Sequence, residues 1–122
     1  MTVSVALDED NGVVLARFHG SSDAQEALSG IAEIRSLVND RPVDGVLIDV
    51  RDADYVPAPG EVRNLVIELV SFLGRRRLAL ITRTEARTDL ARMIAREAAA
   101  RGLEVEVFHD QSGASEWLDA CS

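Results

Sequence analysis

The chain has 122 residues, of which 47% are hydrophobic, and its formal net charge is -8 at pH 7. This length and composition predict a single globular domain over residues 1–122. The acidic balance argues against nucleic acid and against a polybasic membrane anchor, because both need clustered Lys or Arg. All 13 basic residues are Arg, so lysine chemistry of any kind is excluded.

The sequence shows no signal for export or membrane insertion. The first residues lack a basic segment followed by a long apolar run, and no apolar stretch approaches the ~20 residues that a membrane span needs. The one cysteine, Cys121, cannot form an internal disulfide, which fits a reducing compartment. We therefore expect a cytoplasmic protein without a transmembrane segment.

The N-terminal part predicts an antiparallel hairpin followed by a helix. Residues 3–7 alternate between apolar and polar or small side chains, and residues 13–19 return after an Asn-Gly pair at 11–12. Ser22, with a glutamine three residues later, has the form of a helix capping box. The helix is expected to end before Pro42, because the residue preceding proline disfavours helical geometry.

The centre of the chain predicts a buried strand that leads into a strongly apolar helix. Residues 46–50 form a short β-branched-rich run of the kind found in strands buried on both faces. After a loop rich in turn residues at 52–60, apolar positions recur at helical spacing over residues 62–73. Gly74 is suited to end this helix, and the arginines at 75–77 place positive charge near the negative end of its dipole.

The last part alternates strand and helix again. Residues 78–82 and 103–108 predict two more strands, and Thr82 or Thr84 is expected to cap the helix between them. The inward residues are predicted to be Leu90, Ile94 and Ala98 in this helix and Ala114, Trp117 and Leu118 in a terminal one.

A cap at Asp110 or Ser112 starts the terminal helix and completes the order β-β-α-β-α-β-α-β-α. Strands that alternate with helices after a hairpin predict the α/β class. We expect a mostly parallel mixed sheet with the N-terminal antiparallel hairpin at its edge and helices packed on it.

This order, the run at 46–51, the strand at 78–82 and the ending at 105–118 resemble the STAS superfamily, and more narrowly the bacterial SpoIIAA-like (STAS/SEC14-type) proteins. The resemblance spans nearly the whole chain and rests on pattern rather than on an invariant motif. It implies a regulatory protein-interaction module. It also permits binding of apolar ligands or association with membranes, which have been proposed for SpoIIAA-like relatives.

One turn departs from the STAS pattern. STAS anti-sigma-factor antagonists carry Asp-Ser-Ser-Gly after the strand that matches residues 46–50, and a kinase partner phosphorylates the first serine. The matching turn here reads Pro57-Ala58-Pro59-Gly60, in which only the glycine agrees. Because Ala58 has no hydroxyl, this position cannot be phosphorylated.

The helix over residues 62–73 is the main candidate for a functional surface. Ile67 and Phe72 widen its apolar arc to roughly 200°, whereas a surface helix needs about 100°. Neighbouring helices, a homodimer contact or an apolar ligand cleft would each explain the excess. The candidate surface, which includes the preceding loop, comprises Tyr55, Val56, Pro57, Arg63, Ile67 and Phe72.

Two smaller sites follow from the expected sheet edge. Thr82, Arg83 and Thr84 lie where open α/β sheets bind ligands and are a candidate anion site. The acids Asp49, Asp52, Asp54 and Glu61 could supply oxygen ligands to a metal ion, but we favour turn chemistry with local backbone N–H groups.

No nucleophile–base pair, cofactor motif or metal-ligand spacing is visible, so we expect a non-enzymatic protein without a cofactor. The first hypothesis is a STAS-like regulatory module that binds protein, itself as a homodimer or another partner. The alternative is a carrier of a small apolar ligand or lipid, with its cleft under the helix at 62–73.

Overall fold

The computed structural model describes residues 2–20, 24–53, 58–83 and 88–120. Its elements are, in chain order, β1 (Thr2–Asp8), β2 (Val13–Gly20), α1 (Ala24–Asp40), β3 (Gly45–Ala53), α2 (Pro59–Leu73), β4 (Arg77–Ile81), α3 (Thr88–Ala100), β5 (Glu104–Phe108) and α4 (Gln111–Asp119). The predicted order of strands and helices is confirmed.

The five strands form one sheet in the order β1-β2-β3-β4-β5. β1 pairs antiparallel with β2, and every other pair is parallel. Gly12 has a φ of 66°, a conformation that favours glycine, in the turn that joins β1 to β2. The mixed sheet with its antiparallel hairpin at one edge is therefore as predicted.

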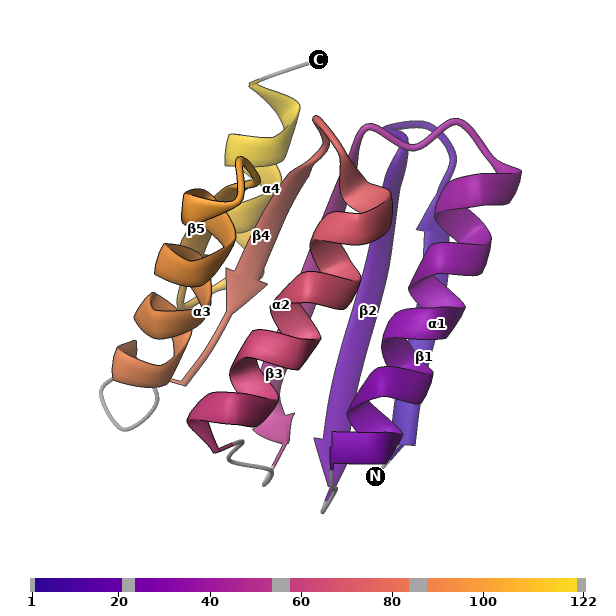
Figure 1. Cartoon of the computed structure of the whole chain (residues 1–122). Coiled ribbons are helices and arrows are strands. Elements are labelled where there is room, and N and C mark those ends of the chain that lie inside the picture. Colours follow the sequence, from indigo (N-terminus) through magenta and orange to yellow (C-terminus); the bar gives the residue numbers. More distant parts are fainter. Residues whose placement is uncertain (1, 21–23, 54–57, 84–87, 121–122) are drawn as a thin grey trace.

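The helices cover the two faces of the sheet unequally. α1, α2 and α3 lie side by side on one face, and α4 lies behind the sheet against β3, β4 and β5 (Figure 1). β3 and β4 are consequently apolar on both faces. On the three-helix side, Val46 and Leu78 join a large core, and on the α4 side Leu47 and Ile81 pack with Leu118.

The C-terminus of α2 is closed by an arginine from the predicted basic run. Arg76 donates from Nε to the carbonyl of Val43 at 2.8 Å, and from one terminal nitrogen to the carbonyls of Phe72 and Leu73 at 3.1 and 3.2 Å. The helix ends at Leu73, and Gly74 follows with a φ of 58°. Positive charge at this helix end is thus bound to specific carbonyl groups.

Two expected helix starts compare differently with the structure. Asp110 caps α4, since its side chain accepts from the amide of Gly113 at 2.7 Å. Thr82 does not cap α3, which begins at Thr88; the Thr82 amide instead donates to the carbonyl of Phe108 at 3.0 Å and continues the sheet. The alternative cap at Thr84 and the capping box at Ser22 lie outside the described residues.

No helix in the described parts of the chain is both long and apolar enough to cross a membrane.

Candidate functional site

The N-terminal turn of α2 contains Ala58, the residue that the sequence resemblance assigns to the serine position of the STAS turn. Ala58 is the N-cap residue, and its backbone amide donates to Oε1 of Glu61 at 2.9 Å. The carbonyl of Ala58 accepts from the amide of Val62 at 2.9 Å. The turn is therefore closed by a carboxylate reaching back to the N-cap amide, with no hydroxyl at the cap.

The outward side of α2 is a narrow, mostly polar surface with one large apolar side chain. Its exposed residues recur at helical spacing, and we call them the outer strip: Gly60, Arg63, Asn64, Ile67 and Ser71. Ile67 is 44% exposed at the middle of this strip. Of the predicted surface, the structure thus brings Arg63 and Ile67 together; Tyr55, Val56 and Pro57 lie outside the described residues.

Most of the remaining apolar arc of α2 is covered. Leu65, Val70 and Phe72 are partly buried and pack against the core. Arg35 of α1 forms an ion pair with Glu68 at 3.6 Å, and Phe72 stands one helical turn after Glu68 on the same side of α2. Phe72 therefore belongs to the boundary between α1 and α2 rather than to the outer strip.

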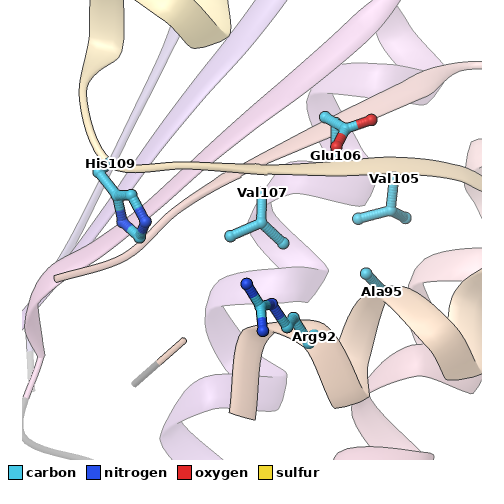
Figure 2. A pocket seen from close by; sticks show the side chains of 6 residues that line it. All are labelled: Arg92, Ala95, Val105, Glu106, Val107 and His109. Carbon is cyan, nitrogen blue, oxygen red and sulfur yellow. The ribbon is translucent and has the colours of Figure 1, made fainter. Parts of the chain in front are cut away.

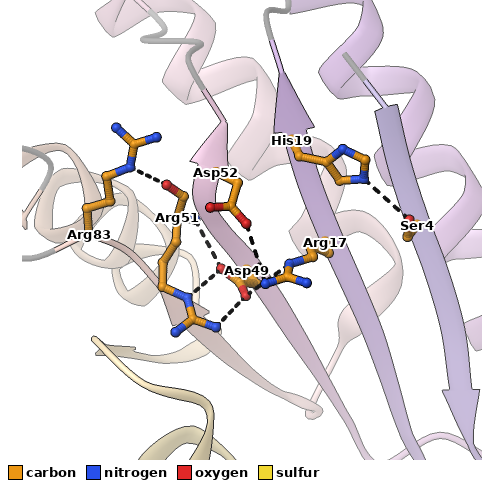
Figure 3. Close-up of polar contacts among 7 residues, drawn as sticks. All are labelled: Ser4, Arg17, His19, Asp49, Arg51, Asp52 and Arg83. Atoms are coloured by element: carbon orange, nitrogen blue, oxygen red, sulfur yellow. Dashed lines mark hydrogen bonds and ion pairs between the residues drawn. The ribbon is translucent and has the colours of Figure 1, made fainter.

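A cluster of charged side chains lies near the C-terminal ends of β2 and β3 (Figure 3). Asp49 is only 5% exposed, and Arg51 donates to its two carboxylate oxygens from Nε at 3.0 Å and from a terminal nitrogen at 2.8 Å. The Arg51 amide adds a bond at 3.0 Å, and Arg17 of β2 lies 3.7 Å from the same carboxylate. Arg17 also pairs with Asp52 at 3.4 Å.

This arrangement sets the protonation of Asp49. Burial alone would raise the pKa of the carboxyl, but the hydrogen bonds from Arg51 and the charges of Arg51 and Arg17 outweigh burial and lower it. The pKa of Arg51 is raised, chiefly by its hydrogen bond to Asp49. Asp49 is thus an ionised carboxylate with both oxygens hydrogen-bonded, and it forms part of a structural ion-pair cluster.

The expectation that Asp52 serves turn chemistry is wrong. β3 continues to Ala53, three residues beyond the predicted strand, so Asp52 lies within a strand and faces Arg17 of its neighbour. Among the described residues, no group of three or more His, Cys, Asp or Glu side chains is placed to hold a metal ion. Asp54 lies outside those residues.

The predicted anion residues do not share one environment. The Thr82 side chain is buried at 2% exposure, and its hydroxyl has no hydrogen-bond partner among the described residues. Arg83 is exposed, and its Nε donates to the carbonyl of Arg51 (Figure 3). His109 Nδ1 lies 3.3 Å from the Thr82 carbonyl. Thr84 lies outside the described residues, so the anion site stays a prediction.

The partners of Asp49 were not predicted from the sequence. Asp49 and Arg51 are two residues apart in a strand, so their side chains lie on the same face, and this spacing was a usable signal. The participation of Arg17 had no local signal, since it depends on the pairing of β2 with β3, where Arg17 is the register partner of Asp49.

No protein-family model and no curated protein matches the chain. Several solved structures do. An anti-sigma factor antagonist from Mycobacterium paratuberculosis is 14% identical, with a TM-score of 0.69 over 96% of this chain and 94% of its own. A protein with a SpoIIAA-like fold from Shewanella loihica is 18% identical, with a TM-score of 0.65 over 96% and 92%.

The phosphorylated form of the Bacillus cell fate determinant SpoIIAA is 13% identical and gives a TM-score of 0.57 over 96% of this chain and 99% of its own. At this level of identity the likeness concerns the fold. The chain has a SpoIIAA-like fold, as the sequence predicted.

Proposed function

We propose that this chain is a non-enzymatic STAS-like regulatory module that binds a protein partner through the outer strip of α2. We further propose that phosphorylation at the start of α2 does not switch this contact. The shared fold with anti-sigma factor antagonists supports the regulatory role. The alanine at the N-cap, Ala58, supports the absence of a phosphorylation switch.

The single observation that carries the proposal is the exposure of Ile67. Val62, Val66, Leu69 and Leu73 of α2 are at most 6% exposed, whereas Ile67 is 44% exposed and is flanked along the outer strip by the polar residues Arg63, Asn64 and Ser71. An apolar centre with a polar rim is the usual anatomy of a small protein–protein contact. The partner is another protein or a second copy of this chain.

The structure gives the carrier hypothesis no support under α2. The side chains beneath this helix are those of Val62, Val66, Leu69 and Leu73. They pack with Leu78 and Leu80 of β4 in one core cluster. A cleft at this place would require that core to open.

A site-specific photo-crosslinker tests the proposal in cells of the native host. Benzoylphenylalanine at position 71, one turn from Ile67 on the outer strip, should yield one discrete adduct, identified by mass spectrometry as a partner protein or a second copy. Ile67→Glu should remove this adduct, because a carboxylate replaces the apolar centre. Met93→Glu should preserve it, since Met93 is similarly exposed (40%) but lies on α3.

The result that overturns the proposal is equally specific. Absence of an adduct from position 71, or an adduct that survives Ile67→Glu, would mean that the outer strip is ordinary protein surface.

A further inference from the structure

Strand β5 forms an edge of the sheet whose outward backbone groups have no strand partner among the described residues. The Phe108 carbonyl accepts from Thr82 of the β4 segment, so Phe108 directs its backbone groups toward β4. In a parallel ladder these directions alternate along the strand. The backbone N–H and C=O groups of Val105 and Val107 therefore point away from the sheet.

A groove of about 280 Å³ lies beside this edge, between β5 and α3 (Figure 2). Its lining residues are Arg92, Ala95, Val105, Glu106, Val107 and His109. Val105 and Val107 project toward Arg92 and Ala95 of α3, whereas Glu106 projects to the opposite side of the strand (Figure 2). An added strand would thus meet Val105, Val107 and Ala95 together with the Arg92 side chain on one face, and the Glu106 carboxylate on the other.

The charges along β5 restrict what can pair with it. Glu104 already forms an ion pair with Arg77 at 2.9 Å. Glu106 is exposed, and the described residues provide it with no ion-pair partner. A carboxylate at the middle of an edge strand favours a basic residue directly opposite and disfavours an acidic one.

These charges also argue against a second copy of this chain at the same edge. Antiparallel pairing of two β5 strands centred on Glu106 would place Glu106 opposite Glu106. Pairing centred on Val105 would place Glu104 opposite Glu106. Both registers bring like charges together, which is a known device against edge-to-edge association.

We propose that the β5 edge binds an extended segment of a partner protein as an additional strand. Apolar side chains of that segment enter the groove beside α3, and a Lys or Arg faces Glu106. Main-chain hydrogen bonds to Val105 and Val107 supply affinity, and the alternation of apolar and basic residues supplies selectivity. This contact is separate from the outer strip of α2 and does not depend on it.

The test uses short peptides, blocked at both ends, and follows backbone amide signals of the full chain by NMR. A peptide of alternating Lys and Val should shift the Val105 and Val107 amides and slow their hydrogen exchange. Peptides of alternating Lys and Gly, or Glu and Val, should bind at least about tenfold more weakly, a difference of about 1.4 kcal/mol. The Lys-Gly peptide controls for general attraction to an acidic protein.

Two variants separate the proposed contact from unspecific binding. Glu106→Lys should reverse the preference between the Lys-Val and Glu-Val peptides. Val107→Pro removes an outward N–H while leaving the bonds of β5 to β4 in place, so it should abolish binding of the Lys-Val peptide. Since Glu106 is exposed, Glu106→Lys keeps the test decisive if Val107→Pro fails to fold.

Amide shifts located away from β5, or peptide binding unchanged by Glu106→Lys, would overturn the proposal. Concentration-dependent self-association that protects the Val105 and Val107 amides without peptide would also overturn it, because the occupant would then be a second copy.

Discussion

Asp49 shows how a carboxylate becomes part of a sheet interior. It lies in β3 on the same face of the strand as Leu47, and its oxygens are bound by Arg51 and approached by Arg17. A buried charge is tolerated when its hydrogen bonds are made, and removing one partner leaves the others unsatisfied. The cluster is therefore expected to stabilise the register between β2 and β3.

Asp49→Asn should lower the free energy of unfolding at pH 7 by about 1–3 kcal/mol, because the charged acceptor for Arg51 is lost. The lowered pKa of Asp49 in the folded state means that its contribution is present above the unfolded-state value of about 3.9 and is lost as pH falls through the folded-state pKa. Urea unfolding at pH 7 and near pH 3 measures this contribution. The difference in the free energy of unfolding between wild type and Asp49→Asn should be smaller at the lower pH.

Asp52→Asn is the matched control for this experiment. Asp52 is exposed, and its ion pair with Arg17 at 3.4 Å lies between two side chains that are each 56% exposed, so its replacement should change stability by no more than about 0.5 kcal/mol. A similar loss of unfolding free energy in both variants, or a difference between wild type and Asp49→Asn that does not depend on pH, would show that ionisation of Asp49 is not the stabilising factor.

At the scale of elements, the packing of α1 on the hairpin depends on a missing side chain. A Cβ built on Gly30 of α1 would lie 2.7 Å from Cε2 of Phe18 and 3.0 Å from Cγ2 of Val3. Phe18 is itself buried at 6% exposure, so its ring has little room to move. The glycine allows the helix to approach β1 and β2 closely.

Gly30→Ala should therefore destabilise the protein by about 1–3 kcal/mol through overpacking, despite the better helix propensity of alanine. Gly60→Ala in the first turn of α2 is the matched comparison, since a Cβ there would meet nothing within 4 Å. It should be neutral or stabilise by up to about 1 kcal/mol. Thermal melts of Gly30→Ala and Gly60→Ala measure this difference, and equal changes in melting temperature would refute the close-packing explanation.

The elements differed in how far the sequence could predict them. β4, α2 and α4 were predictable because their apolar spacing and end residues agree, as Gly74 and Asp110 illustrate. The start of α3 could not be predicted, because Thr82 is of a residue type that often caps helices, but its amide donates to the carbonyl of Phe108 in β5. The length of β3 was also missed, since Arg51 and Asp52 interrupt its apolar run, and Asp52 and Ala53 pair with His19 and Gly20 of β2.

The candidate surface was predictable only in part. The width of the apolar arc on α2 correctly drew attention to this helix, but spacing alone could not tell which residues α1 and α3 would cover. Phe72 is half-buried and Ile67 is exposed, although both extend the same arc. Charge clusters such as Arg17 with Asp49 need a strand register before they can be recognised.

For the molecule as a whole, the arrangement of layers predicts a gradient of local stability. β3 and β4 are interior strands, whereas β1 and β5 form the two edges. Amide hydrogen exchange of the dilute, unliganded protein should be slowest in β3 and β4 and faster at the outward amides of β5. Equal protection of β5 and β4 would contradict the exposed edge on which the peptide-binding proposal depends.

The strand order β1-β2-β3-β4-β5 has a consequence for how the chain acquires its structure. Each strand pairs with the strand that precedes it in the sequence, so no strand has to be inserted between two that are already paired. Contacts between sequence neighbours keep the contact order low for a parallel sheet, which favours rapid folding. The sheet can grow one strand at a time in the direction of synthesis. Its last strand is β5, where Glu106 disfavours pairing with the β5 strand of a second copy of the chain.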